Sequence, residues 1–427
     1  MTVSPADASL RSIHIDVTET LATGKWTGIE RVVRKLVAAL GALEAEGGPQ
    51  IHPVASIEGR FYRLNAEGLA RLGAQRSAAG TGSAGALVQF VGKLLTIVPP
   101  VYVVLQAKQK QRKFEPLLRP FLEVAPASFG PHDAILLLDS YWAGVSSIAA
   151  AASARRDGAI VVSALYDIIP ITHPKSMPSL MTLVFPRHLN RALAISDGVV
   201  AISRQSAREL RTYLGARLPK LPIHWFHLGN DNAPGPARTH RAGGPFRYAI
   251  VGTIEPRKGH DRVLDAFERR WATGSPSKLT IIGKLGWASP DMKARLDNHP
   301  ERGARLAIVH DASDSDLATI LGSTDAVILA SQVEGFGLPI IEAFARDIPV
   351  IASDIPIFRE VGGDAIAYFD VGDASALPAA IAAFEADPDI WRARAAAFTW
   401  PDWNTAAGEV LTAIRAIADG EPNPGNA

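Results

Sequence analysis

Two glutamates on either side of a glycine-rich turn form the strongest chemical signal in the sequence. The segment SQVEGFGLPIIEAF (331–344) carries Glu334 before the turn and Glu342 after it. An apolar run precedes the turn, and a helix is expected near Pro339, since Pro is favoured at the first helical position. Free N–H groups at a helix start bind anions. We therefore expect a diphosphate over this turn, with both carboxylates accepting hydrogen bonds from hydroxyl groups of a nucleotide-sugar.

The adjacent basic residues Arg257 and Lys258 give a second signal, in VGTIEPRKGHDRVLDAF (251–267). We expect a strand to end at 251–252 and a helix to start near Gly259. Arg grips phosphate oxygens with two parallel hydrogen bonds, and Lys adds a compact charge. Such a pair alone is most often a solvated part of the surface. Its place at the carboxyl end of a strand, where open α/β sheets bind ligands, favours phosphate binding.

A third, weaker signal is the turn at Thr27–Gly28, within KWTGIERVVRKLVAAL (25–40). A small residue and free N–H groups stand where the chain enters a helix. The functional reading is a contact to phosphate, and the structural reading is a tight strand-to-helix connection. The spacing is not that of a G-x-G-x-x-G fingerprint, so these residues alone leave both readings open.

Short apolar runs alternating with helix-length segments are the elements that must position these turns. Runs rich in Val and Ile and apolar on both faces indicate buried parallel strands. They lie at 12–17, 51–57, 134–139, 159–165, 198–203, 246–252, 278–283, 305–310, 325–330 and 348–353, with helices expected at 29–45, 204–214, 259–272, 314–322 and 339–346. Two series of βα units predict two Rossmann-like domains with doubly wound parallel sheets.

The boundary between the two series is the Pro/Gly/Ala-rich, aperiodic segment at 231–245, which indicates a linker. We expect an N-terminal domain at 1–230, with an insertion at 75–125, and a C-terminal domain at 245–400. A further helix is expected at 401–418, returning toward the N-terminal domain.

The composition of the chain excludes several kinds of site and argues against some partners. The chain has 427 residues, 47% of them hydrophobic, which is enough for two domains with large cores. A formal net charge of +1 argues against a nucleic-acid partner. The absence of cysteine excludes disulfides, thiolate metal sites and Cys nucleophiles. The N-terminus lacks the pattern of a secretory signal, so we expect a cytoplasmic protein.

One apolar segment, 85–105, breaks the alternation and is followed by a basic stretch that ends at Lys113. Lys93 and a Pro-Pro pair make it a poor transmembrane helix. An apolar stretch with a basic flank suits an anchor on an anionic membrane surface. The alternative is an ordinary core or interdomain helix whose basic end faces water. We expect 85–113 to contact the inner membrane, because it lies in an insertion between strands.

Together the motifs resemble the family 4 retaining glycosyltransferases. The shared features are the E-x7-E element EGFGLPIIE (334–342), the G-T-x-E-x-R-K-G loop (252–259), the T-G-I-x-R turn (27–31) and SRQSAREL (203–210). The resemblance implies the GT-B fold, an α/β architecture of two Rossmann-like doubly wound domains facing a cleft. It also implies transfer of a hexose from a nucleotide-diphosphate sugar with retention of configuration.

The resemblance assigns roles to individual residues. Arg257 and Lys258 match the basic pair that stabilises the donor diphosphate, Glu342 the glutamate that binds the donor ribose, and Glu334 the one near the donor sugar. Further donor-binding positions are Phe336, Gly337 and Leu338 around the sugar and phosphates, Gly28 beside the phosphate, Gly252 and Thr253 in the basic loop, and Gly283 and Lys284, which with His310 fall where such enzymes hold the base.

The segment YDIIPITHP (166–174) departs from the family pattern. Many relatives carry a His before the Asp, whereas this chain has Tyr166 before Asp167. His173 does not occupy the motif position, so no histidine role is transferred. Asp167 is a candidate that contacts acceptor or donor sugar, and a cap at the end of a strand is the alternative.

The expected reaction needs cations to neutralise the leaving diphosphate, and Arg257, Lys258 and helix N-termini supply them. The donor half has no D-x-D motif, so we expect catalysis without metal or cofactor. No carboxylate nucleophile is evident, which favours a front-face transfer in which the departing phosphate helps to deprotonate the acceptor.

For the donor we expect GDP-mannose or a related GDP-sugar, because EGFGLPIIEA (334–343) and IPIFREVGGDA (355–365) resemble mannosyl- and rhamnosyltransferases. UDP- and dTDP-sugars remain open. The expected acceptor is a lipid-linked glycan or polysaccharide of a bacterial surface. Alternatives are a nucleotide-sugar hydrolase, an epimerase or a phosphorylase on the same fold, and a catalytically silent GT-B scaffold subunit.

Overall fold

The structure is a computed structural model that describes residues 10–24, 26, 28–74, 114–143, 146–217, 220–231 and 244–421. The chain divides into two compact units: unit 1 comprises Met1–Gly229 and Trp403–Ala427, and unit 2 comprises Asn230–Asp402. Each unit is described by itself. The segment expected at the membrane (85–113) and residues 232–243 of the expected linker lie outside the described residues.

Unit 1 is built on a sheet of seven strands in the order β3-β2-β1-β4-β5-β6-β7. Neighbouring strands are parallel except β2 and β3, which are antiparallel. The order reverses between β1 and β4, which makes this the switch point of the sheet. The strands are β1 (Ser12–Asp16), β2 (Gln50–Ile57), β3 (Arg60–Arg63), β4 (Asp133–Leu137), β5 (Ile160–Leu165), β6 (Gly198–Ala201) and β7 (Ile223–Trp225).

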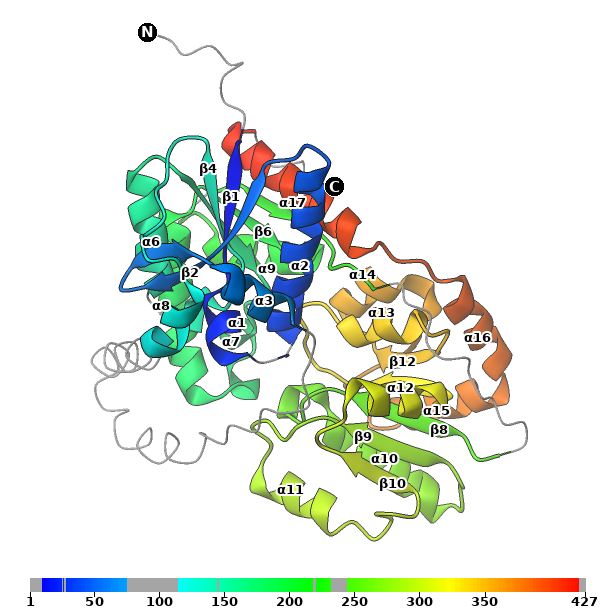
Figure 1. Cartoon of the computed structure of the whole chain (residues 1–427). Coiled ribbons are helices and arrows are strands. Elements are labelled where there is room, and N and C mark those ends of the chain that lie inside the picture. Colours follow the sequence, from blue (N-terminus) through cyan, green and yellow to red (C-terminus); the bar gives the residue numbers. More distant parts are fainter. Residues whose placement is uncertain are drawn as a thin grey trace. The chain divides into compact units, whose positions relative to one another are not determined.

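The helices of unit 1 come from both ends of the chain. They are α1 (Thr18–Thr23), α2 (Gly28–Ala45), α3 (Ala66–Gly73), α6 (Ser146–Arg156), α7 (Ile169–Thr172), α8 (Ser179–Ile195), α9 (Arg204–Leu214) and α17 (Trp403–Ala418), with short 3-10 turns at Arg119–Phe121, Tyr141–Ala143 and Pro174–Ser176. The C-terminal helix α17 lies beside α2 and also contacts β6 (Figure 1). This close approach needs Gly198, because a Cβ there would lie 2.5 Å from Ile417 Cδ1.

Unit 2 is built on six parallel strands in the order β10-β9-β8-β11-β12-β13. The strands are β8 (Arg247–Val251), β9 (Lys278–Ile282), β10 (Leu306–Val309), β11 (Ala326–Leu329), β12 (Val350–Ser353) and β13 (Ala367–Phe369). The chain runs from β8 to one edge and resumes at β11 toward the other. The switch point therefore lies between β8 and β11, where ligands bind in open α/β sheets.

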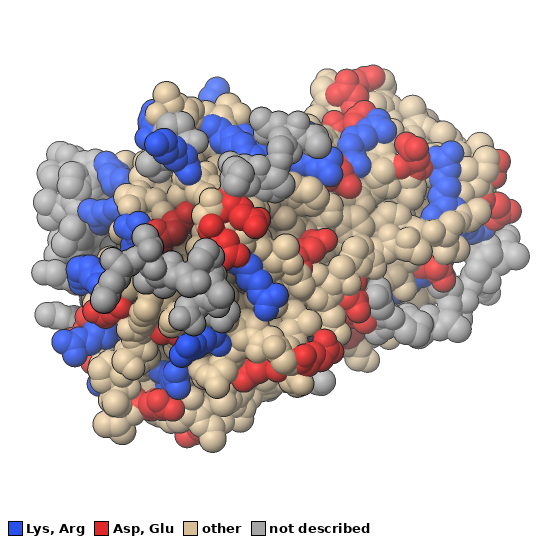
Figure 2. All heavy atoms as spheres, turned by 90° about the horizontal axis from the view of Figure 1, so that it is seen from above, with Lys and Arg blue, Asp and Glu red and all other residues tan. Residues whose placement is uncertain are grey.

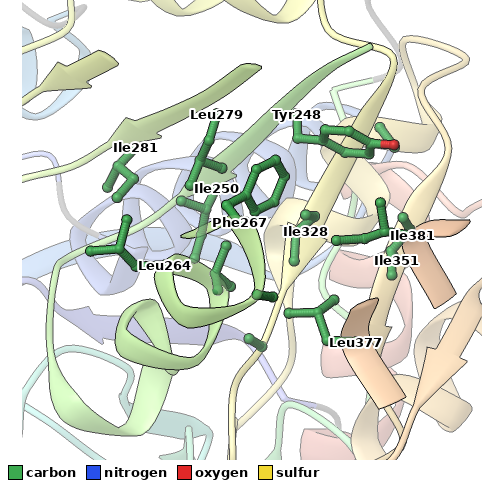
Figure 3. Packing of buried hydrophobic residues seen from close by; sticks show 14 of the residues in the cluster. Tyr248, Ile250, Leu264, Phe267, Leu279, Ile281, Ile328, Ile351, Leu377 and Ile381 are labelled. Carbon is green, nitrogen blue, oxygen red and sulfur yellow. The ribbon is translucent and has the colours of Figure 1, made fainter. Parts of the chain in front are cut away.

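The helices of unit 2 are α10 (His260–Ala272), α11 (Pro290–Asp297), α12 (Asp314–Gly322), α13 (Leu338–Phe344), α14 (Pro356–Gly362), α15 (Ala376–Ala386) and α16 (Pro388–Ala397), with 3-10 turns η5 (Pro256–Lys258) and Gly363–Ala365. Helix α10 packs its apolar face on the sheet. Phe267 meets Tyr248 of β8 with ring centroids 5.3 Å apart, and Leu264 lies near Ile281 of β9 (Figure 3). This burial holds the start of α10 at the carboxyl end of β8.

The two doubly wound sheets confirm the predicted α/β class. Every apolar run named above overlaps a strand of the structure, and α9 and α12 have the predicted bounds. In the described part of the chain no helix is long and apolar enough to cross a membrane. On the surface drawn in Figure 2, basic and acidic side chains are interspersed, in keeping with the net charge of +1.

Candidate functional site

Two loops meet at the switch point of unit 2. One follows β8 and carries the basic pair, and the other follows β11 and carries Glu334. The backbone N–H of Gln332 donates to the carbonyl of Arg257 at 2.8 Å, which ties the loops together. Gly259, with φ of 66°, makes the contact possible, because a Cβ on it would lie 2.2 Å from the carbonyl oxygen of Ala330. The strand pairing thus brings together residues some 75 positions apart in the sequence.

A cluster of four charged side chains, Glu255, Arg257, Lys258 and Glu334, occupies this meeting point. Arg257 Nη1 donates to Glu334 Oε2 at 2.7 Å, and Lys258 Nζ donates to Glu334 Oε1. Arg257 Nη2 pairs with Glu255 Oε1 at 2.6 Å. The carboxylates are the more deeply buried members, with exposed fractions of 8% for Glu334 and 3% for Glu255. The cluster therefore holds two cations and two carboxylates in a mostly desolvated place.

The pKa values of the two carboxylates are shifted in opposite directions. Burial alone would raise the pKa of Glu334, but Lys258 and Arg257 outweigh it and lower the pKa to about 2. Burial raises the pKa of Glu255 above its usual value, against the opposing effects of Arg257 and Lys258. Glu334 is thus firmly ionised, whereas Glu255 is the carboxylate of the cluster that gains a proton more readily.

The glycine-rich turn leads directly into α13. Gly337, with φ of 104°, is the N-cap of this helix, and Pro339 lies in its first turn. A Cβ on Gly337 would lie 2.9 Å from Phe358 Cε1. Phe336 is buried, and its ring packs edge-on against Trp400 at 5.9 Å. Apolar contacts hold the turn on its buried side. At the start of α13, Leu338 supplies a backbone N–H at the positive end of a short helix, whereas Pro339 has none and that of Ile340 donates to the carbonyl of Gly337 at 2.9 Å.

Glu342 lies on α13 one turn beyond the helix start and is partly buried. Its backbone carbonyl accepts a hydrogen bond from Arg346 Nη1 at 2.8 Å. Ser331 was not singled out in the sequence, yet its hydroxyl donates to Glu334 Oε1 at 2.8 Å. Glu255 was part of the recognised loop motif but received no role. The signal that could have found it is its place two residues before Arg257, where an acidic side chain can pair with the guanidinium.

The loops after β8 and β9 run side by side. Gly252 and Gly283 approach so closely that a Cβ on Gly283 would lie 1.9 Å from the carbonyl oxygen of Gly252. The backbone N–H of Ile254 donates to the carbonyl of Lys284 at 2.9 Å. His310 Nδ1 lies 3.1 Å from the carbonyl oxygen of Gly283.

The loops after β8 and β9 carry several side chains that are exposed to solvent. Thr253 and Lys284 are exposed, and Lys284 Nζ lies 3.6 Å from Asp311 Oδ1. Leu285 and Trp287 each leave 36% of their surface exposed. An exposed leucine and tryptophan beside backbone polar groups form a surface on which a flat base can stack.

Gly28 and Asp167 belong to unit 1. Gly28 is the exposed first residue of α2. Asp167 follows β5, and its Oδ1 accepts the backbone N–H of Ile169 at 3.0 Å. This local contact fits the alternative reading of Asp167, and the contact of Asp167 with a sugar stays a prediction. Tyr166 is buried and donates to the carbonyl of Leu138 at 3.0 Å.

The described residues contain no group of three or more His, Cys, Asp and Glu side chains arranged to hold a metal ion. The site that the structure assembles in unit 2 is instead built from guanidinium, ammonium and carboxylate groups beside a helix start. Those groups suit an anionic ligand that also carries hydroxyl groups.

Comparisons with known proteins identify the domain that contains this site. Residues 236–397 match the family described as Glycosyl transferases group 1. The serotype-specific mannosyltransferase WbdA of Escherichia coli is 32% identical over 290 residues, which make up 62% of this chain and 34% of WbdA. The O-antigen chain mannosyltransferase RfbU of Salmonella typhimurium is 36% identical over 143 residues, 33% of this chain and 39% of RfbU. The matched region thus spans about a third of the first curated relative.

Solved structures show the same fold over nearly the whole chain. Anabaena Alr3699/HepE, determined in complex with UDP and glucose, superposes with a TM-score of 0.55 at 16% sequence identity, covering 96% of this chain and 98% of that one. The likeness confirms the GT-B fold that the motifs predicted. The cluster around Arg257 and Glu334 lies within residues 236–397, the part of the chain that is similar to the group 1 glycosyltransferases.

Proposed function

We propose that this protein is a retaining hexosyltransferase that moves a sugar from a nucleotide-diphosphate donor to a glycan of a bacterial surface. The observation that carries the proposal is the buried cluster of Arg257 and Lys258 with Glu334, beside the start of α13 and inside the matched domain. Cations fixed in a mostly desolvated site stabilise a leaving diphosphate without reorganising during the reaction.

In the proposed mechanism Arg257, Lys258 and the backbone N–H of Leu338 at the start of α13 neutralise the departing diphosphate. Glu342 accepts hydrogen bonds from the donor ribose, and Glu334 from the donor sugar. The freed phosphate oxygen takes the proton of the acceptor hydroxyl, which attacks the anomeric carbon from the same face. The new bond then keeps the anomeric configuration of the donor, and the step needs neither a protein nucleophile nor a metal.

For the donor we propose GDP-mannose or a related GDP-sugar. Support comes from the relatives, which carry the name mannosyltransferase. HepE was solved with UDP, and at 16% identity that likeness concerns the fold alone. The loop bearing Leu285 and Trp287 is the proposed place of the base, at the carboxyl end of β9.

For the acceptor we propose a lipid-linked or polysaccharide glycan, handled by unit 1. Support comes again from the name of RfbU, an O-antigen chain mannosyltransferase. Contact with the inner membrane surface through 85–113 is part of this proposal and rests on the apolar and basic composition of that segment. A silent scaffold subunit is disfavoured, because such a protein has no use for the buried ionic cluster.

A thermal-shift screen against GDP, UDP, ADP and dTDP tests the donor site first, because a ligand that binds only the folded protein raises its apparent stability. We expect GDP to raise the melting temperature most. A transfer assay with GDP-mannose and an isolated glycan acceptor follows, with the anomeric configuration of the product read by NMR. Absence of a shift with every nucleotide would contradict the proposal, and an inverted product would contradict its mechanism.

A further inference from the structure

Glu255 is a buried carboxylate to which the proposed reaction gives no task. It precedes the turn η5 at the N-cap position, but its side chain makes no capping hydrogen bond there. The carboxylate turns instead to Arg257 Nη2 at 2.6 Å, with only 3% of its surface exposed. A carboxylate this deeply buried costs free energy unless it is paired, so the contact to Arg257 is the main reason it is tolerated.

The guanidinium of Arg257 is held from two sides. Nη1 donates to Glu334 Oε2 at 2.7 Å and to the carbonyl of Val333 at 3.2 Å, while Nη2 pairs with Glu255. The two carboxylates come from different loops, after β8 and after β11. Because the guanidinium is planar, contacts at both of its terminal nitrogens fix its orientation.

The charges of the cluster cancel when both carboxylates are ionised. Arg257 and Lys258 contribute two positive charges, and Glu255 and Glu334 contribute two negative ones. A nucleoside diphosphate brings at least two further negative charges into the same desolvated place. The negative charges of the diphosphate and of the carboxylates repel each other strongly where the dielectric constant is low. The binding of a diphosphate therefore favours any change that removes one negative charge from the cluster.

Of the two carboxylates, Glu255 is the one whose surroundings favour the loss of its negative charge. Glu334 is bridged by both cations and by the hydroxyl of Ser331. Among the described residues Glu255 has one ion pair, to Arg257, and burial already raises its pKa. The neighbouring His260 at the start of α10 is buried, and burial lowers its pKa to about 4, so it stays neutral. Lys284, on the loop that approaches Glu255 through Gly286, is exposed and turned to Asp311.

We propose that Glu255 is a positioning residue for Arg257 that takes up one proton from solvent when a nucleoside diphosphate binds. The ionised carboxylate becomes a neutral carboxylic acid, and the cluster changes from neutral to a single net positive charge. The carboxylic acid can still accept a hydrogen bond from Arg257 through its carbonyl oxygen, so the guanidinium keeps its orientation while its charge becomes available to the diphosphate. This inference rests on the proposed donor site.

The test is calorimetric titration with GDP, and with UDP in parallel, in two buffers of different ionisation enthalpy. The difference between the buffers counts the protons taken up per ligand. In the wild-type protein we expect uptake approaching one proton, and an affinity that falls by up to about tenfold per pH unit above the pKa of Glu255. The measurement needs no variant, so the proposal stays testable if substitutions at this site impair folding.

Glu255→Gln separates the role of this carboxylate from a structural one. The amide keeps an oxygen for Arg257 and removes the charge, so we expect GDP to bind without proton uptake and with a flatter pH profile. Asp354→Asn is the control, because it alters an exposed ion pair between Asp354 and Arg359 in the same unit. It should leave the proton uptake and the pH profile of GDP binding as in the wild type. Uptake that persists in Glu255→Gln, or its absence in the wild type, overturns the role of Glu255. Binding of neither nucleotide overturns the donor site as well.

Discussion

Asp16 is the last residue of β1, Asp139 follows the end of the neighbouring parallel strand β4 by two residues, and neither carboxyl group reaches solvent. Asp139 Oδ2 accepts the backbone N–H of Thr20 at 2.6 Å, and its Oδ1 accepts that of Ser140 at 2.7 Å. Burial, reinforced by the charge of Asp16, raises the pKa of Asp139 to about 8. Burial raises the pKa of Asp16 as well. Two such carboxyl groups at one switch point titrate as a pair rather than independently.

This pair makes the stability of unit 1 depend on pH. The unfolded chain releases the proton of Asp139 near its ordinary pKa of 3.8, whereas the folded chain keeps it until about pH 8. Unfolding therefore releases a proton within that window, and the free energy of unfolding falls as the pH rises through it. Above about pH 8 both states are ionised and the effect reaches its full size.

Asp16→Asn should relieve this cost. Asp16 Oδ1 accepts the N–H of Thr18 at 3.2 Å, and the amide oxygen can keep that contact while the charge is lost. We expect the variant to gain about 1 kcal/mol or more at pH 8 and little near pH 4, since each pKa unit removed from Asp139 is worth about 1.4 kcal/mol. Urea unfolding at the two pH values measures this. Asp157→Asn, an exposed carboxylate of the same unit, is the control. An equal gain at both pH values would argue against the coupling.

Lys258→Ala should lower turnover without unfolding the protein. The substitution removes one of the two cations that face Glu334 and leaves Arg257 in place. By analogy with the loss of one oxyanion donor, we expect kcat to fall roughly 10²–10³-fold. Steady-state transfer assays measure the loss, and circular dichroism checks the fold. Lys293→Ala, which breaks an exposed pair with Asp297, serves as the matched control and should keep its activity. Near wild-type transfer by Lys258→Ala would remove it from the site.

Most of the sheet could be predicted from the sequence because parallel strands covered on both sides are continuous apolar runs. The three strands without such runs were missed. β3 reads RFYR, an antiparallel edge strand of four residues with an arginine at each end and so no apolar run. β7 and β13 have three residues each, too few for a pattern. Edge and very short strands are defined by their partners in the folded sheet rather than by their own composition.

The candidate site, like the sheets, could be predicted only in part from the sequence. Arg257, Lys258 and Glu334 were found because their motifs lie at strand ends, and strand order then brings those ends together. The ion pairs within the cluster could not be predicted, because they depend on how two loops some 75 residues apart pack against each other. The burial of Glu255 has the same origin. Sequence spacing indicates which residues can do chemistry. Tertiary packing decides which of their charges are paired with an opposite charge in the folded protein.

Gly283→Ala should disturb the loops after β8 and β9. A Cβ at this position would lie 1.9 Å from the carbonyl oxygen of Gly252, and backbone cannot move aside as a flexible side chain can. We expect a loss of about 1–3 kcal/mol from this overpacking, seen as a lower melting temperature and weaker nucleotide binding. Gly274→Ala is an informative control, because Gly274 has φ of 86° but no neighbouring atom within 4 Å of an added Cβ. Equal melting temperatures for the two variants would mean that the close contact is not what matters.

Chelation should leave transfer largely intact. In the proposed mechanism the charge of the leaving diphosphate is met by Arg257 and Lys258, groups that need no metal to be positively charged. At the start of α13 the backbone N–H of Leu338 adds a donor to the same diphosphate. Transfer rates measured with EDTA present, and again after Mg²⁺ or Mn²⁺ is restored in excess, should therefore agree within about twofold, well below the 10²–10³-fold change expected when a principal electrostatic contact is lost. If EDTA abolished transfer and a divalent cation restored it, the two basic side chains would not suffice and the leaving group would depend on a metal ion.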